Sequence, residues 1–131
     1  MPESMNLNIS GTVFEIELVA TGEQKWRGLS DRTTLATRAG MLFIWDEEEP
    51  RRFNMRRMHF SIDILFIDRS GFLINKCCDA APWRGPVGRH YYSNRPAMYV
   101  LEVNAGTCGS LGIEEGDRVF QTERLAACES S

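Results

Sequence analysis

Apolar and polar residues alternate along several short stretches of this chain. Every second position from 14 to 20 is apolar, with glutamates at two of the positions between, which is the pattern of a strand buried on one face. Residues 6–9 alternate in the same way, and Ser10-Gly11 between the two stretches fits a two-residue turn. The chain is therefore predicted to begin with a β-hairpin.

Further stretches rich in branched and aromatic residues are predicted strands, at residues 41–45, 53–55, 62–67, 72–74, 98–103 and 118–122. The stretch 62–67 is almost wholly apolar, which is typical of a central strand covered on both faces. Asp68 to Gly71 has the composition of a tight turn. Residues 62–74 are therefore predicted to form a second hairpin.

Two short helices are predicted between these strands. Thr21-Gly22-Glu23-Gln24 has the T-x-x-Q form of a capping box, which places Thr21 as the N-cap of a helix. Trp26 and Leu29 are three residues apart and are expected to share its buried side. Residues 106–112 fit one helical turn that ends at Gly112.

Together these elements predict a mostly β fold, either a small antiparallel β-sandwich or a partly closed barrel, with one or two short helices. An open α+β sheet with a packed helix is the alternative. The 131 residues suit one domain spanning 1–131. We expect an ordered core at about residues 5–122 and a frayed tail at residues 123–131.

The composition indicates a globular protein, with 43% hydrophobic and 25% charged residues. The net charge of −3 argues against a nucleic-acid-binding domain. No apolar stretch approaches the roughly 20 residues of a membrane span. The acidic residues 46–49 precede a group of arginines, Arg51, Arg52, Arg56 and Arg57. A solvated turn beside a basic strand face is the simplest interpretation, and an anion-binding face is the alternative.

Residues 1–4 lack the basic and apolar regions of a secretory signal. Adjacent cysteines rarely bridge each other, and no C-x-x-C spacing occurs among Cys77, Cys78, Cys108 and Cys128. We therefore expect a cytoplasmic protein whose four thiols are reduced.

Several segments of the chain resemble the motifs of one known family, in the same order along about residues 12–120. The motifs, as they stand here, are E-Q-K-W-R-G-L at 23–29, G-M-L-F at 40–43, F-N-M-R at 53–56, I-D-I-L-F-I-D at 62–68, P-A-M-Y-V-L-E at 96–102 and L-G-I-E-E-G-D-R-V at 111–119. Taken together, these segments resemble DUF192, a family of uncharacterised proteins widespread in prokaryotes. The resemblance implies a small β-rich fold and no assigned activity.

Asp63 is the first candidate functional residue, because it lies within the apolar stretch 62–67. A buried carboxylate is costly unless it is paired or hydrogen-bonded. The simplest interpretation is a structural bond to Arg27, Arg56 or Arg57, or to loop amides. The alternative is a ligand-binding or general acid–base role.

Other candidate groups have weaker support from their spacing. Soft metal donors occur at Met55, Met58, His59, Cys77 and Cys78. Without C-x-x-C or H-x-x-x-H spacings we expect no bound metal and no cofactor. A Cys–His pair for nucleophilic catalysis would need Cys108 with His59 or His90, and nothing in the spacing supports it.

The long loop at residues 80–94 carries aromatic residues beside arginines, a composition that suits a flat or anionic ligand. They are Trp83, Arg84, Arg89, Tyr91 and Tyr92. The leading hypothesis is a non-catalytic domain that binds a small ligand or peptide between this loop and residues 53–63. Its proposed floor consists of Met55, Arg56, Asp63 and Tyr99. An enzyme using Asp63 as acid or base, and a structural domain that presents an edge strand to a partner, remain alternatives.

Overall fold

The structure, a computed structural model, describes residues 3–86, 88–123 and 125. Six strands form one mixed sheet in the order β1 (Glu3–Ile9), β2 (Thr12–Val19), β3 (Ala39–Glu49), β8 (Ala97–Asn104), β5 (Ile62–Ile67) and β6 (Leu73–Ala80). A separate two-stranded ribbon pairs β4 (Arg52–Asn54) with β7 (His90–Tyr92). The helices are α1 (Gly22–Arg27) and α2 (Thr107–Leu111). The prediction of a mostly β fold with one or two short helices is confirmed.

The sheet is mixed because β2 and β3 run parallel. The chain reaches β3 from the end of β2 through α1 and the loop that follows, a crossover of the length that parallel pairing requires. The other pairs of neighbouring strands are antiparallel, as expected for hairpins. The strand order runs from β1 to β6 without closure among the described residues.

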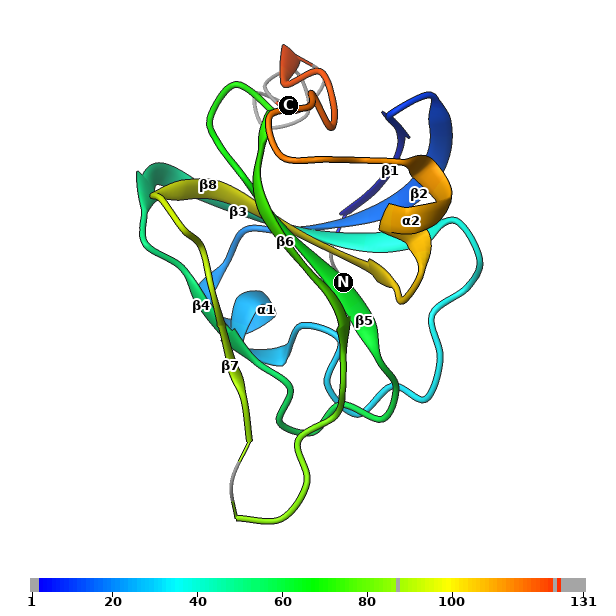
Figure 1. Ribbon diagram of the computed structural model, residues 1–131, viewed down its shortest axis with the longest axis vertical. Helices are drawn as coiled ribbons and strands as arrows, with labels where there is room; N and C mark the ends of the chain where they lie inside the picture. The colour runs from blue at the N-terminus through cyan, green and yellow to red at the C-terminus, as the bar shows by residue number, and fades with distance from the viewer. Residues whose placement is uncertain (1–2, 87, 124, 126–131) are drawn as a thin grey trace.

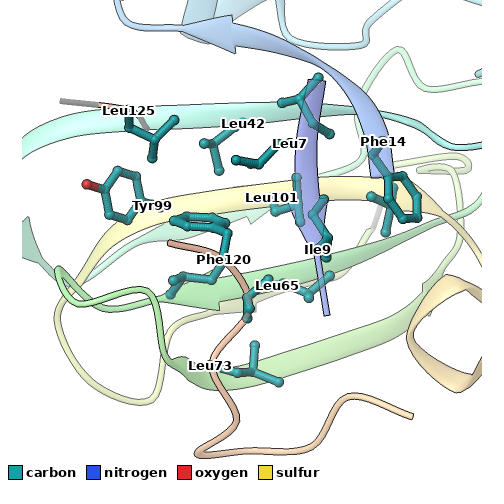
Figure 2. Close-up of a cluster of buried hydrophobic side chains, with 14 of the residues drawn as sticks. Leu7, Ile9, Phe14, Leu42, Leu65, Leu73, Tyr99, Leu101, Phe120 and Leu125 are labelled. Carbon is teal, nitrogen blue, oxygen red and sulfur yellow. The ribbon is translucent and has the colours of Figure 1, made fainter. Parts of the chain in front are cut away.

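Each face of the six-stranded sheet carries its own buried cluster. Figure 1 shows α1 and the β4–β7 ribbon on one side of the sheet, and α2 on the other. We call the side of α1 and the β4–β7 ribbon the α1 face; its cluster includes Met41, Phe43, Met55, Ile64 and Val100. The cluster on the opposite face includes Leu7, Phe14, Leu65, Tyr99 and Phe120, and Figure 2 shows these side chains together.

Parts of the element prediction differ from the structure. The predicted loop 80–94 contains the short strand β7, which pairs with β4. The predicted strand 118–122 forms only an isolated bridge between Phe72 and Arg118. Within the predicted tail 123–131, Leu125 is buried in the cluster opposite α1, and residues 124 and 126–131 lie outside the described part of the chain.

Candidate functional site

A cleft of about 770 Å³ opens on the α1 face of the sheet. One wall is α1 and the turn that follows it, and the other is β4 with the loop after it. Residues of β3 and β8 also line it, among them Phe43, Trp45 and Glu102. The cleft therefore lies between the sheet and the two small elements that cover it.

The capping box predicted at Thr21 is formed and fixes the N-terminal end of α1. Thr21 Oγ1 accepts a hydrogen bond from the backbone N–H of Gln24 at 3.1 Å, and Gln24 Oε1 accepts the N–H groups of Ala20 and Thr21. The helix ends after Arg27 because Gly28 adopts a positive φ of 48°. At that position an added Cβ would lie 3.2 Å from the Phe43 ring, so Gly28 also permits the close approach to β3.

The expectation that Trp26 and Leu29 share a buried helix face is wrong. Leu29 is buried, whereas Trp26 is 72% exposed. The helix ends between them, so the three-residue spacing no longer places both side chains on one face. Instead the Arg57 guanidinium stacks on the exposed Trp26 ring, 4.2 Å from its centroid.

Aromatic rings form an apolar wall inside the cleft. Phe53 of β4 contacts Phe43 of β3 edge to face, with ring centroids 5.0 Å apart, and contacts Trp45 at 6.3 Å. Trp45 in turn has two cations over its ring, Lys25 Nζ at 4.6 Å and the Arg51 guanidinium at 4.0 Å. This wall offers an apolar surface beside positive charge.

The charge around the cleft has one sign. Five basic residues line it, Lys25, Arg27, Arg52, Arg56 and Arg57. Only Arg57 forms an ion pair with a described carboxylate, a long contact of 3.9 Å to Asp31. In a chain whose net charge is −3, this is a local excess of positive charge.

Glu102 is the one carboxyl group that lines the cleft among the described residues. It is 5% exposed, and its cross-strand neighbours are Met41 and Ile64. No described residue donates a hydrogen bond to its carboxyl group or forms an ion pair with it. Among the described residues no fully buried side-chain oxygen lacks a partner, so the oxygens of Glu102 keep some access to the cleft. Burial raises the pKa of Glu102 to about 8, because the charged form loses its hydration. The side chain is therefore mostly uncharged at neutral pH.

The structure brings together some of the predicted site residues. Arg56 lines the cleft and stacks on Trp83, 4.5 Å from the ring centroid. These two residues and Arg57 also line a neighbouring hollow of about 380 Å³. Met55, also predicted on the floor of the site, does not line the cleft but is buried in the cluster on the α1 face. Tyr91, which pairs with Phe53, packs against the same cluster. Arg84 is exposed and lines neither hollow.

Asp63 and Tyr99, both predicted on the floor of the binding site, do not line the cleft. Their strands point them to the opposite face of the sheet. Tyr99 packs edge to face with Phe120, with ring centroids 5.4 Å apart (Figure 2). Side chains alternate along a strand, so Glu102 lies on the α1 face whereas Tyr99, three positions earlier, lies on the other.

Asp63 is buried and accepts hydrogen bonds from backbone amides. The sequence suggested either this role or a bond to an arginine. Oδ1 accepts the N–H of Asp79 at 2.9 Å, and Oδ2 accepts the N–H groups of Gly106 at 3.1 Å and Cys108 at 3.0 Å. Gly106 is the N-cap of α2 and supplies no side chain. Asp63 therefore caps this helix from a distant strand.

Asp63 also belongs to a cluster with Cys78 and Cys108, whose possible metal-ligand atoms all lie within 4.8 Å of one another. The carboxylate oxygens already accept three amide hydrogen bonds, however. Burial is the main reason that the pKa of the Cys108 thiol is raised, which disfavours the thiolate that a metal would need. Cys77, Cys78 and Cys108 are free thiols, and Cys128 lies outside the described residues.

The fold and the cleft define a small, mostly β domain with a cationic, aromatic cleft on one sheet face. The model of the family DUF192, described as an uncharacterised ACR, matches residues 5–121. The chain therefore belongs to this family, as its motifs indicated. No curated protein matches the chain.

Two solved structures are similar to this one. A protein of unknown function from Novosphingobium aromaticivorans has a TM-score of 0.80 and 30% identity, over 88% of this chain and 84% of that one. A "putative transcription regulator" from Sinorhizobium meliloti has a TM-score of 0.79 and 30% identity, over 93% of this chain and 95% of that one.

The described helices offer no candidate for a membrane span.

Proposed function

We propose that this chain is a ligand-binding domain whose cleft on the α1 face takes a small organic anion with an apolar or aromatic body. The charge imbalance of the cleft carries the proposal. Among the described residues, five basic side chains line it, and Glu102, the one carboxyl group there, is mostly uncharged. Like charges that face one hollow attract an anion, and low-dielectric walls strengthen that attraction. This is the anion-binding alternative that the arginine-rich segment left open.

The aromatic wall supports an apolar ligand body. Phe43, Trp45 and Phe53 line the cleft, and of these Trp45 and Phe53 are only partly buried and can contact a ligand. Aromatic pairs gain about 0.5–1.5 kcal/mol beyond their area burial. The volume of the cleft, about 770 Å³, lies in the range of about 300–1,000 Å³ typical of small-molecule sites. A ligand of one or two rings with one acidic group matches both properties.

Binding without catalysis fits the cleft better than an enzyme. No histidine, cysteine or second carboxyl group lines it within the part of the chain that the structure describes. Asp63, the acid or base of the enzyme hypothesis, has its carboxylate oxygens occupied by backbone amides on the opposite face. A pair of groups for acid–base chemistry is therefore not brought together in the cleft.

The test compares an anion with its uncharged analogue. We expect naphthalene-2-sulfonate to bind and to bind roughly tenfold more tightly than naphthalene-2-sulfonamide, as loss of a charge-assisted interaction predicts. Isothermal titration calorimetry measures both dissociation constants at neutral pH. Equal affinity for the two compounds, or no binding of the sulfonate, would overturn the proposal.

A double variant locates the binding. Arg27→Gln with Arg52→Gln removes two exposed cations of the cleft wall and should weaken sulfonate binding roughly tenfold. The matched control is Arg38→Gln, since Arg38 is exposed and does not line the cleft. A control variant that loses as much affinity as the double variant would place the binding elsewhere.

A further inference from the structure

We propose that Glu102 recognises the ligand directly, its uncharged carboxylic acid donating an O–H hydrogen bond to an oxygen of the bound anion. This inference rests on the proposed function and adds the ligand's chemistry at the floor of the cleft. The ligand class is an oxyanion, a carboxylate or sulfonate with an apolar body. A protein molecule whose Glu102 is ionised must therefore take up one proton at this side chain when it binds the ligand.

The geometry around Glu102 carries the inference. The side chain is 5% exposed and lines the cleft from the central strand β8. The residues opposite it on β3 and β5 are Met41 and Ile64, which offer no polar side-chain atom that could pair with the carboxyl group as nitrogen or oxygen. Buried side-chain polar groups are hydrogen-bonded in the large majority of cases. Since no fully buried side-chain oxygen of the described residues lacks a partner, the Glu102 oxygens are not sealed in the core. They have no partner among the described residues and are open on the cleft side to an atom of the ligand.

The surrounding charges select an anion as that partner. The charged groups that face the cleft are Lys25 and Arg27 of α1, Arg52 of β4, and Arg56 and Arg57 of the following loop. They attract an oxyanion to the rim, and the uncharged acid below can donate to one of its oxygens. An O–H···O⁻ bond of this kind is short and stronger than a bond between neutral groups.

The ionised form of Glu102 would weaken the binding of the oxyanion. Its negative charge would repel the oxyanion, and it would have no proton to donate. Since burial raises the pKa of Glu102 to about 8, the binding-competent form predominates at neutral pH and is lost in mildly alkaline solution. Affinity should therefore fall as pH rises through this value.

The experiment follows the affinity for naphthalene-2-sulfonate from about pH 6.5 to about pH 9.5 by calorimetry. The sulfonate keeps its charge over this range, and so do the arginines. Burial lowers the pKa of Lys25, so all proteins carry Lys25→Arg to remove the titration of that amine. With Glu102 present we expect a loss of about tenfold between pH 7 and pH 9, because only the protonated fraction binds.

Two variants isolate the role of Glu102. Glu102→Gln keeps an uncharged hydrogen-bond donor, so its affinity should match that of Glu102 near pH 7 and stay constant across the range. Glu102→Leu removes the donor, and we expect several-fold weaker binding, also constant with pH. Measurements in buffers of different ionisation enthalpy should show uptake of nearly one proton per ligand near pH 9 with Glu102, and none with either variant.

The outcomes separate this inference from the proposed function. If the sulfonate binds through the arginines but Glu102→Gln shows the same pH dependence as Glu102, the cleft binds anions and Glu102 is not the donor. If affinity does not change with pH when Glu102 is present, the inference also fails. If the sulfonate does not bind at any pH, both proposals fail.

Discussion

Asp63 and Glu102 are two carboxyl groups buried in the same sheet, and they differ in what surrounds them. Asp63 accepts three backbone N–H bonds on one face of the sheet. Glu102 meets apolar neighbours and an open cleft on the other face. Full hydrogen bonding makes a buried polar group part of the fold, whereas an unpaired one is retained at a cost to stability. We therefore assign a structural role to Asp63 and a binding role to Glu102.

Substituting Asp63 by Asn should destabilise the protein. An asparagine has one acceptor oxygen, so its NH₂ group would face at least one of the N–H donors of Asp79, Gly106 and Cys108. A buried donor without a partner costs about 1–3 kcal/mol, and the lost charge adds to this, giving about 2–4 kcal/mol. Thermal unfolding followed by circular dichroism should show a decrease in Tm of at least about 6 °C.

The matched control for this substitution is Asp79→Asn. The Asp79 side chain is exposed, its backbone N–H can still donate to Asp63, and its φ of 55° suits asparagine. Its Tm should stay within about 2 °C of the unmodified protein. An unchanged or raised Tm for Asp63→Asn would contradict the structural role and return Asp63 to the functional candidates.

The sequence pattern identified Asp63 as a candidate functional residue but did not identify Glu102. Asp63 was found because it interrupts the apolar stretch 62–67. Glu102 interrupts the strand 98–103 in the same way, and alternation with Val100 could have placed it on a buried face. The contacts that distinguish the two residues come from segments far away in sequence, such as Gly106 for Asp63 and α1 for the cleft. Those contacts exist only in the folded chain.

At the scale of elements, α1 supplies one wall of the cleft without any buried side chain of its own. It has six residues, too few to be stable alone. Its capping box and the turn at Gly28 fix its two ends, and Leu29, just after the helix, is buried in the cluster of the α1 face. The positions of Lys25 and Arg27 depend on these local contacts.

Replacing Thr21 by Ala should loosen this wall. The side-chain acceptor for the Gln24 N–H is lost, and loss of an N-cap costs about 1 kcal/mol. The N–H groups of Lys25 and Gly28, which bond to Thr21 and Gln24 carbonyls, should then exchange with solvent several-fold faster in hydrogen-exchange experiments. Thr34→Ala, at an exposed loop position, is the control and should leave both exchange rates unchanged. Equal rates in Thr21→Ala and the unmodified protein would show that the sheet, and not the cap, holds α1.

Local patterns predicted most elements, because alternation and capping are properties of neighbouring residues. The capping box at Thr21 and the helical turn before Gly112 are confirmed. The parallel pairing of β2 with β3 was missed, since it depends on the course of the crossover. Strand β7 was missed because its three residues are held by pairing with β4 rather than by their own pattern.

At the scale of the whole molecule, one face of the sheet is fully packed and the other face carries the cleft. The face that carries Tyr99 and Phe120 is packed into a continuous core (Figure 2). The α1 face is covered only in part, by α1 and the β4–β7 ribbon (Figure 1), and the cleft remains between them. The apolar stretch 62–67 predicted a central strand buried on both faces. The sequence predicted a binding site along residues 53–63, part of which lines the cleft. The opposite wall at α1 was not predicted, because the gap between the covering elements depends on how they pack in three dimensions.

Glu102 should make the stability of the whole molecule depend on pH. Its pKa is raised from 4.5 to about 8 in the folded protein, so the folded state favours the protonated form. The contribution of Glu102 to the free energy of unfolding is largest below about pH 4.5, where this side chain is protonated in both the folded and the unfolded state. It decreases as pH rises from there to about 8, because the unfolded chain ionises and the folded one does not. Above about pH 8 both states are ionised, and the contribution of Glu102 stays constant.

Glu102→Gln should therefore stabilise the protein, by a margin that grows from about pH 4.5 to about pH 8 and then levels off. At pH 7 the expected gain is about 2–3 kcal/mol, from 1.36 kcal/mol per pKa unit, which raises Tm by roughly 6–10 °C. Urea unfolding at a series of pH values measures the difference in the free energy of unfolding, in which the other titrating groups largely cancel. Glu115→Gln, at an exposed position, should show no such gain. A Glu102→Gln protein that is no more stable than the original at pH 7 would show that Glu102 is ionised in the folded state, and the proton donor of the cleft would have to be sought elsewhere.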